Sequence, residues 1–293
     1  MEKLFLTASD GLDLSVIYSK VSNPKGLVQI IHGMAEHKER YLDFIKFLND
    51  NGYSVIISDL RGHGESINKE YPLGHIDGYE MIINDQKIIT DYIKNDNPNV
   101  DLYLFGHSMG TLLSRCYLME HDQLFKKVIL SGTVCYTPGA GFITNVAKKK
   151  AKKNKYGYSK LLFACSNSFS TKVDFSWLSY SKTNIDNYEK DELCGYKFTN
   201  TGYYTLFGMV KALKEYKKYQ CKNKELEILS LSGKDDRTTG GTKGLKGVVK
   251  ILNKIGYKNV SFKEYLKMKH EILNEDDREL VYDDVLKFIE GRE

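Results

Sequence analysis

The pentapeptide GHSMG, residues 106–110, follows the short apolar run 101–105 and precedes a helical pattern over 111–121. A turn of this form places a serine between a strand and a helix, and the chain reverses so sharply that side chains in place of the two glycines would clash. The hydroxyl of Ser108 is then exposed at the helix N-terminus, where free backbone N–H groups and the helix dipole stabilise a developing negative charge. The pattern indicates an α/β fold and makes Ser108 a candidate nucleophile.

Apolar runs that predict strands recur along the chain, and helical patterns separate most of them. The runs cover residues 4–7, 14–19, 27–31, 54–58, 101–105, 127–132, 226–231 and 260–265. Runs that are apolar throughout are typical of parallel strands buried on both faces. The first two runs flank Asp10-Gly11, which is typical of a hairpin. The sequence therefore predicts an α/β fold with a mostly parallel eight-stranded sheet, an antiparallel start and helices on both faces.

The alternation of strands and helices lapses after residue 133 and resumes near residue 220. This stretch is rich in aromatic residues, glycine and lysine. We expect a core formed by residues 1–133 and 221–293 and an inserted cap, or lid, formed by residues 134–220. Such an insertion would fold over the carboxyl ends of the strands, where open α/β sheets bind their ligands.

A serine nucleophile needs a histidine to take its proton and a carboxylate to hold that histidine, in the chain order Ser, Asp or Glu, His. Only His121 and His270 follow Ser108. His121 lies at the far end of the helix that starts at Ser108, so its side chain cannot reach the serine. His270 is therefore the candidate base. The acid should follow the run 226–231, where Asp235 and Asp236 are adjacent. Either could serve, and the other would form a turn.

The loop His32–His37 follows a buried strand and can help to stabilise an oxyanion. The backbone N–H of Met34 would act there beside that of Met109. Other histidines occur in this loop and in the loop 59–66. We expect them to brace loops, because this chemistry uses one imidazole.

Six motifs, HGMAEH, DLRGHGES, GHSMG, DFSWLS, SGKDD and HEILNE, occur in this order along nearly the whole chain. Together they resemble the α/β-hydrolase family of monoacylglycerol lipases and lysophospholipases, a group also labelled serine aminopeptidase S33-like. The resemblance implies a nucleophile, an acid, a base, an oxyanion hole and two residues that border a polar head-group pocket. In that order, these residues are Ser108, Asp236, His270, Met34 with Met109, and Glu36 with Arg40.

The resemblance implies a serine carboxylic-ester hydrolase that acts on lipophilic monoesters, such as monoacylglycerol or lysophospholipid, through an acyl-enzyme on Ser108. A small-ester carboxylesterase, an S33-type peptidase and a non-catalytic binding protein with the same fold are the alternatives. A peptidase would need an acidic group to hold a free amine, and Glu189, Asp191 and Glu192 are candidates. Apolar side chains of the expected lid are candidates for the lining of an acyl tunnel: Phe142, Leu161, Leu162, Phe163, Phe169, Phe175, Trp177 and Leu178.

Positive charge is concentrated in the expected lid. Residues 134–220 hold 15 lysines and no arginine against 6 acidic residues, whereas the whole chain carries a net charge of +5. The tract Lys148–Lys155 would be attracted to an anionic membrane by about 1 kcal/mol for each lysine near the surface. A solvated helix face is the alternative.

Several classes of function and location are disfavoured by what the sequence lacks. It contains no dinucleotide fingerprint, P-loop, metal motif or nucleic-acid-binding motif, so we expect no cofactor, no metal and no nucleic-acid partner. No run of 18 apolar residues predicts a membrane span, and the N-terminus has the pattern of a hairpin instead of a signal peptide. The five cysteines are scattered, which argues against a disulfide framework. We expect a cytoplasmic protein, with a peripheral position at the membrane as the alternative.

Overall fold

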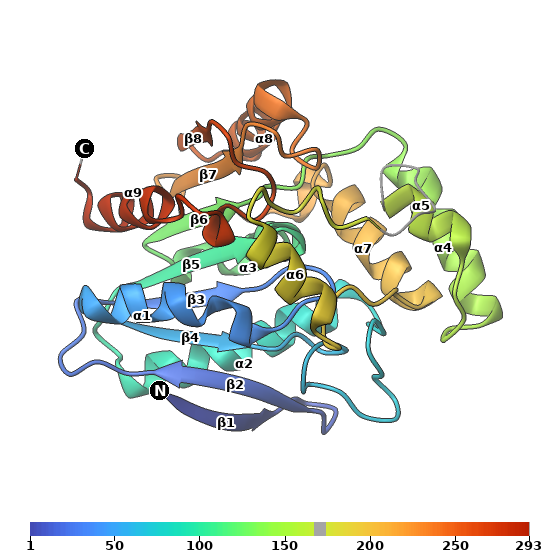
Figure 1. The fold of residues 1–293 in the computed structure, drawn as a ribbon, viewed down its shortest axis with the longest axis horizontal. Helices are drawn as coiled ribbons and strands as arrows, with labels where there is room; N and C mark the ends of the chain where they lie inside the picture. The colour runs from blue at the N-terminus through green and yellow to red at the C-terminus, as the bar shows by residue number, and fades with distance from the viewer. Residues whose placement is uncertain (167–173, 293) are drawn as a thin grey trace.

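The computed structural model describes residues 1–166 and 174–292 and contains one eight-stranded sheet in the order β1-β2-β4-β3-β5-β6-β7-β8 (Figure 1). Strand β2 is antiparallel to both its neighbours, β1 and β4, and the other pairs are parallel. The predicted fold is confirmed, and each predicted strand lies within two residues of an observed one. The strands are β1 (Glu2–Thr7), β2 (Asp13–Ser19), β3 (Gly26–Ile31), β4 (Tyr53–Ser58), β5 (Leu102–His107), β6 (Lys127–Ser131), β7 (Glu227–Gly233) and β8 (Asn259–Tyr265).

Helices cover both faces of the sheet (Figure 1). Helices α1 (Leu42–Asp50) and α9 (Glu279–Glu290) bury their apolar sides in one core, and α2 (Tyr79–Asp96), α3 (Met109–His121) and α8 (Gly241–Ile255) do so in the other. Successive side chains of a strand point to opposite faces, so Leu104 enters one core and Phe105 the other. This double burial explains why the central strands are apolar throughout.

The segment between β6 and β7 contains helices α4 (Ala140–Lys153), α5 (Lys160–Ser166), α6 (Lys182–Lys190) and α7 (Asn200–Ala212), and no strand among its described residues. Helix α7 packs against both α4 and α3. Figure 1 shows α4, α5 and α7 beyond one end of the sheet. The short 3-10 helices of the chain are η1 (Lys38–Tyr41), η2 (Asp122–Leu124), η3 (Tyr216–Lys218) and η4 (Ile272–Asn274). Across the described residues, every helix falls short of the length and apolar character needed to cross a bilayer.

A buried ion-pair network ties the β1–β2 hairpin to helix α2. The side chain of Arg61 is 1% exposed and donates to Asp85 through Nε at 2.7 Å and Nη2 at 2.8 Å. Its Nη1 donates to Asp10 at 2.8 Å, and this hydrogen bond is the main cause of an Asp10 pKa of about 2. Breaking such a pair is costly because the remaining charge stays buried without a partner.

Candidate active site

Ser108 stands at the junction of β5 and α3 in a backbone conformation that few residues adopt. Its φ is 52° and its ψ is −119°, and it is the N-cap residue of α3. A non-glycine residue in such a region costs about 1–3 kcal/mol and persists only where its surroundings hold it. Here the N–H of Ser108 donates to the carbonyl of Ser131 at 2.9 Å, and its own carbonyl accepts from the N–H and hydroxyl of Thr111 at 2.8 and 2.7 Å.

Both glycines of GHSMG are required because a larger side chain would clash with neighbouring atoms. A Cβ on Gly106 would lie 2.4 Å from Ser114 Oγ, and a Cβ on Gly110 would lie 2.1 Å from the carbonyl oxygen of Ile31. Neither separation is sterically allowed. The clash predicted from the sequence is therefore confirmed, and it arises from the close approach of α3 to β3 and β5.

The loop after β8 brings His270 to Ser108. His270 Nε2 lies 2.7 Å from Ser108 Oγ, and its Nδ1 lies 2.9 Å from Asp236 Oδ2. The imidazole is 1% exposed, and the Trp177 ring lies over it with the centroids 4.8 Å apart. Burial lowers the pKa of His270, but the charge of Asp236 and its hydrogen bond outweigh burial, so the pKa is raised above its ordinary value.

Asp236, and not Asp235, is the acid that reaches His270. Asp235 is exposed and accepts a hydrogen bond from the Tyr180 hydroxyl at 3.0 Å. The carboxylate of Asp236 is buried and accepts from the N–H and hydroxyl of Thr238, both at 2.7 Å, and from the Thr239 hydroxyl at 2.8 Å. Burial raises the pKa of Asp236, but His270 and these donors lower it by more, so the group is a carboxylate at neutral pH.

Met34 and Met109 both line the cavity that Ser108 lines. Within the described residues, neither of their backbone N–H groups donates to a protein acceptor. The residue after Met34, Ala35, has a φ of 53°, which marks a sharp turn in this loop. Two free donors next to a serine hydroxyl are the arrangement that an oxyanion hole requires.

A cavity of about 670 Å³ opens onto Ser108 and His270. Among the described residues its lining is mostly apolar and includes side chains from α3, α4, α5 and α7. Of the lid side chains predicted to line a tunnel, all but two do so, namely Phe142, Leu161, Phe163, Phe175, Trp177 and Leu178. Leu162 is fully buried outside the described lining, and Phe169 lies outside the described residues.

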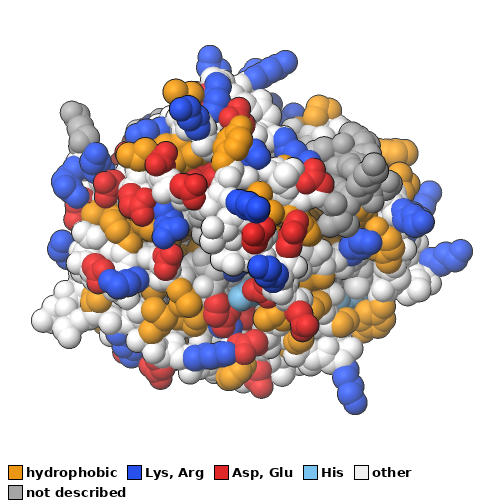
Figure 2. Space-filling view, viewed as in Figure 1, with side chains coloured by type: hydrophobic (Ala, Val, Ile, Leu, Met, Phe, Trp, Pro, Cys, Tyr) orange, Lys and Arg blue, Asp and Glu red, His pale blue; other side chains and the backbone are white. Residues whose placement is uncertain are grey.

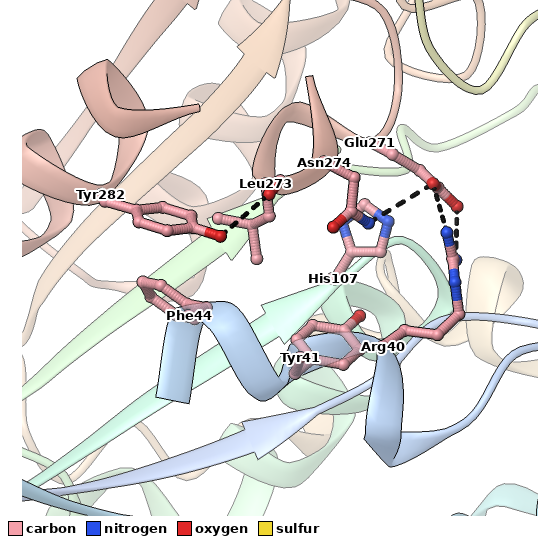
Figure 3. A pocket seen from close by; sticks show the side chains of 8 residues that line it. All are labelled: Arg40, Tyr41, Phe44, His107, Glu271, Leu273, Asn274 and Tyr282. Atoms are coloured by element: carbon pink, nitrogen blue, oxygen red, sulfur yellow. Dashed lines mark hydrogen bonds and ion pairs between the residues drawn. The ribbon is translucent and has the colours of Figure 1, made fainter. Parts of the chain in front are cut away.

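Glu36 and Arg40, which the resemblance places beside a head-group pocket, are in contact with each other but differ in their access to the cavity. Glu36 is part of the cavity lining, whereas Arg40 is not among its described residues. Arg40 instead borders a void of about 10 Å³ behind the site, together with His107 and Glu271 (Figure 3). Figure 3 shows the guanidinium of Arg40 directed at the carboxylate of Glu271.

Two of the histidines expected to brace loops, His32 and His63, contact the backbone of the loop 59–66. His32 Nε2 accepts from the N–H of Leu60 at 2.9 Å, and His63 Nδ1 lies 3.1 Å from the carbonyl oxygen of Arg61. His121 is at the end of α3, and its ring is tilted against that of Tyr117 with the centroids 5.0 Å apart.

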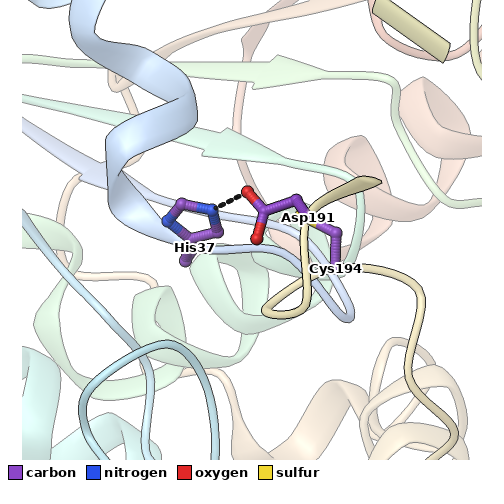
Figure 4. A group of neighbouring side chains, drawn as sticks. All are labelled: His37, Asp191 and Cys194. Atoms are coloured by element: carbon purple, nitrogen blue, oxygen red, sulfur yellow. Dashed lines mark hydrogen bonds and ion pairs between the residues drawn. The ribbon is translucent and has the colours of Figure 1, made fainter. Parts of the chain in front are cut away.

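His37 lies near Asp191 and Cys194, and this trio has the residue types of a metal site (Figure 4). Both ring nitrogens of His37 are already engaged, Nε2 with Asp191 and Nδ1 with Glu39, each at 2.7 Å. Burial raises the pKa of the Cys194 thiol, which disfavours the thiolate that a metal requires. The observed contacts therefore favour a hydrogen-bonded bridge between the loop His32–His37, the candidate oxyanion loop, and the segment after α6.

Several residues around the site were not found by sequence reasoning. Thr238 and Thr239 donate to the carboxylate of Asp236, and Glu271 and Asn184 contact Arg40. Trp177, predicted only to line a tunnel, also lies over the ring of His270. The two threonines carried a usable signal, because Ser and Thr shortly after an aspartate commonly bond back to it in a turn. Asn184 carried none, since it is distant in sequence from the other site residues.

Comparison with known proteins places these features in a family. Residues 22–277 match the family model described as "Serine aminopeptidase, S33". The monoglyceride lipase of Mus musculus is 30% identical over 190 residues, and the chain spans 64% of its own length and 59% of that relative's length in this match. The monoacylglycerol lipase of Mycolicibacterium smegmatis is 23% identical over 275 residues, which cover 93% of this chain and 91% of that protein.

A solved structure agrees in fold. The carboxyl esterase of Bacillus coagulans, determined in complex with glycerol, superposes with a TM-score of 0.87 at 23% identity and covers 99% of this chain and 98% of that chain. At 23% sequence identity, this structure supports the fold of the chain and says nothing about its substrate. With the match to the family model extending over most of the sheet and both candidate loops, the chain belongs to the serine aminopeptidase S33 family of α/β-hydrolases.

Proposed function

We propose that this protein is a serine carboxylic-ester hydrolase that acts on lipophilic monoesters, such as monoacylglycerol or lysophospholipid, through an acyl-enzyme on Ser108. One observation carries the proposal: the hydroxyl of Ser108, 2.7 Å from His270 Nε2, opens onto a largely apolar cavity of about 670 Å³. A nucleophile beside a base that a third group orients is the general arrangement for covalent acyl transfer. The cavity supplies space for a long apolar acyl chain.

In the proposed reaction, Ser108 Oγ attacks the ester carbonyl while His270 Nε2 takes the hydroxyl proton. The N–H groups of Met34 and Met109 donate to the oxyanion of the tetrahedral intermediate. His270 then gives its proton to the leaving alcohol, and an acyl ester remains on Ser108. Water, deprotonated by the same imidazole, attacks this ester; the bond to Ser108 Oγ then breaks, the imidazolium returns the proton to Oγ, and the fatty acid is released. Throughout, Asp236 keeps the proton of the neutral imidazole on Nδ1 and stabilises the imidazolium.

The cavity and the names of relatives support the proposed substrate class. Two relatives carry the names monoglyceride lipase and monoacylglycerol lipase, and a third, from Bacillus subtilis, is named a phospholipase. The acidic residues considered for a peptidase, Glu189, Asp191 and Glu192, are outside the described lining of the cavity. This placement favours an ester over a substrate with a free amine.

We further propose that residues 134–220 form a lid whose outer surface meets the membrane. Phe142 is 76% exposed and Leu161 is 53% exposed, and both also line the cavity. The lysines of the tract Lys148–Lys155 are exposed except Lys150, which is half-buried. Figure 2 has hydrophobic and basic side chains together at the edge where Figure 1 places α4 and α5. Apolar groups at the mouth and lysines beside it suit an anionic lipid surface.

Graded esters test the substrate class. Each buried methylene contributes about 0.8 kcal/mol, so kcat/KM for p-nitrophenyl esters should rise by up to about 15-fold per two carbons until the cavity is full. Monoacylglycerol, lysophosphatidylcholine and an aminoacyl anilide, assayed next, separate the lipid esters from the peptidase alternative. A flat chain-length profile would favour a small-ester hydrolase.

A further inference from the structure

Arg40 is the centre of a buried network behind the candidate site. Its Nη1 donates to Glu36 at 2.9 Å and to Glu271 at 2.7 Å, and its Nη2 donates to Glu271 at 2.7 Å and to Asn184 at 2.9 Å. The guanidinium carbon also lies 4.7 Å from the centroid of the Tyr188 ring. The side chain of Arg40 is 10% exposed, and those of Glu36 and Glu271 are 4% and 3% exposed.

The two carboxylates are next to the groups that the proposed reaction needs in fixed positions. Glu36 accepts a hydrogen bond from the N–H of Gly33, the residue before Met34, and another from the Tyr41 hydroxyl at 2.9 Å. Glu271 follows His270 directly, and its N–H donates to the carbonyl of Leu178 at 2.7 Å. Arg40 therefore links the loop that carries Met34 to the loop that carries His270.

The same network reaches helix α6. The Asn184 amide donates to Glu271 at 2.7 Å while its oxygen accepts from Arg40. Nearby, the Tyr188 hydroxyl and the N–H of Gly195 both donate to the carbonyl of Ala35, at 2.8 and 2.9 Å. Residues 184–195 thus hold the oxyanion loop directly as well as through Arg40.

We propose that Arg40 is a positioning residue that holds the oxyanion loop, the His270 loop and helix α6 in one fixed arrangement. This inference rests on the proposed function, because it concerns the geometry of the same site. It gives Arg40 a role other than contact with a substrate head group, since both of its terminal nitrogens are occupied by protein acceptors. It also makes α6 a contributor to kcat, unlike the cavity-lining helices α4 and α5, which would act on substrate binding.

The test compares Arg40→Lys with a matched control, Arg61→Lys. Both wild-type arginines are buried and paired with two acidic side chains, but the network of Arg61 joins the β1–β2 hairpin to α2. A lysine keeps the charge and cannot reproduce the bidentate contacts of the guanidinium. We expect both variants to lower Tm, and only Arg40→Lys to lower kcat, by about 10- to 100-fold on a short soluble ester, with KM changed by less than about threefold. Asn184→Ala, outside the described cavity lining, should lower kcat several-fold in the same assay.

A second readout is independent of catalysis. Amide hydrogen exchange over residues 33–36, 268–272 and 184–195 should be faster in Arg40→Lys than in the wild type, and unchanged there in Arg61→Lys. Unchanged exchange in Arg40→Lys, or a kcat that follows Tm equally in both arginine variants, would overturn the positioning role. If instead the wild type hydrolyses no ester and its Ser108 does not react with a fluorophosphonate, the proposed function fails, while the exchange comparison still decides the role of Arg40.

Discussion

Replacing Asp236 with asparagine tests the orientation of the base, and the outcome can be worked out from the neighbours of each carboxylate oxygen. Oδ1 accepts from the backbone N–H and the hydroxyl of Thr238, both at 2.7 Å. An amide NH₂ on that side would face a backbone donor that cannot turn away, and leaving it unpaired costs about 1–3 kcal/mol. Oδ2 instead faces the Thr239 hydroxyl at 2.8 Å, which can rotate to accept, and His270 at 2.9 Å. The NH₂ is therefore expected on the Oδ2 side.

An NH₂ group in that position donates to His270 Nδ1 and forces the proton of the neutral imidazole onto Nε2. Because Nε2 is the atom 2.7 Å from Ser108 Oγ, the imidazole then has no lone pair for the serine proton. Loss of the correct tautomer in a triad lowers kcat by about 10⁴-fold, which corresponds to about 5.4 kcal/mol in the activation barrier. We expect a loss of this order with the fold retained.

Asp235→Asn is the control, because Asp235 is exposed and makes its side-chain contact with Tyr180. Its kcat should stay within about twofold of the wild type, as for most surface substitutions. Both variants are assayed for kcat on a soluble p-nitrophenyl ester, and their circular dichroism spectra and Tm are recorded in parallel. The reasoning is refuted if Asp236→Asn keeps more than about a tenth of the wild-type kcat, or if Asp235→Asn is the more damaging change.

Three further predictions concern packing, pH dependence and the lid. Gly110→Ala should destabilise the protein by at least about 1–3 kcal/mol, because its Cβ would lie 2.1 Å from a backbone oxygen. Gly247→Ala in α8 is the control: its Cβ would meet nothing within 4 Å, so it should raise the free energy of unfolding by about 0.5–1 kcal/mol. Chemical denaturation measures both, and an equal effect would contradict the close approach of α3 to β3. Glu271→Gln removes a carboxylate that raises the pKa of His270, so the pKa of His270 should fall. The acidic limb of the pH profile of kcat/KM, where the imidazole becomes neutral, should then move to lower pH. A shift to higher pH would contradict the effect of the Glu271 charge on His270. Glutamine in place of the six lysines of the tract should weaken binding to anionic vesicles without changing hydrolysis of a soluble ester. Added salt should weaken the binding of the wild type, because it screens the charges. Equal binding by both proteins at low salt would leave the tract as a solvated surface. These are Lys148, Lys149, Lys150, Lys152, Lys153 and Lys155.

Local sequence patterns were sufficient to predict the sheet and the sharp turn at Ser108. The strands around Leu104 and Ile129 are mostly apolar because both faces are covered, and this pattern can be recognised without tertiary information. The two glycines flanking Ser108 likewise reflect a strictly local steric need. Elimination between the two histidines that follow Ser108 selected His270, and the structure has its Nε2 at 2.7 Å from Ser108 Oγ.

Contacts between distant segments could not be predicted in the same way. The run 226–231 locates the end of β7, but only the conformation of the following turn decides that Asp236 is buried against His270 and Asp235 is exposed. Arg40 and Asn184 are 144 positions apart, and no periodic pattern connects them. The resemblance places Arg40 at the border of a head-group pocket, but its contacts with Glu36, Glu271 and Asn184 arise from tertiary packing, which the sequence does not show.

Trapping the acyl-enzyme tests the central claim most directly. The wild type is mixed with a p-nitrophenyl ester of a long-chain fatty acid, quenched in acid within the first turnovers and analysed by mass spectrometry after proteolysis, with Ser108→Ala treated identically. The account predicts a burst of p-nitrophenol and a peptide that carries the acyl mass on Ser108, and neither in the variant. Turnover by Ser108→Ala at a rate near that of the wild type, or an acyl group found on another residue of the active wild type, would contradict it.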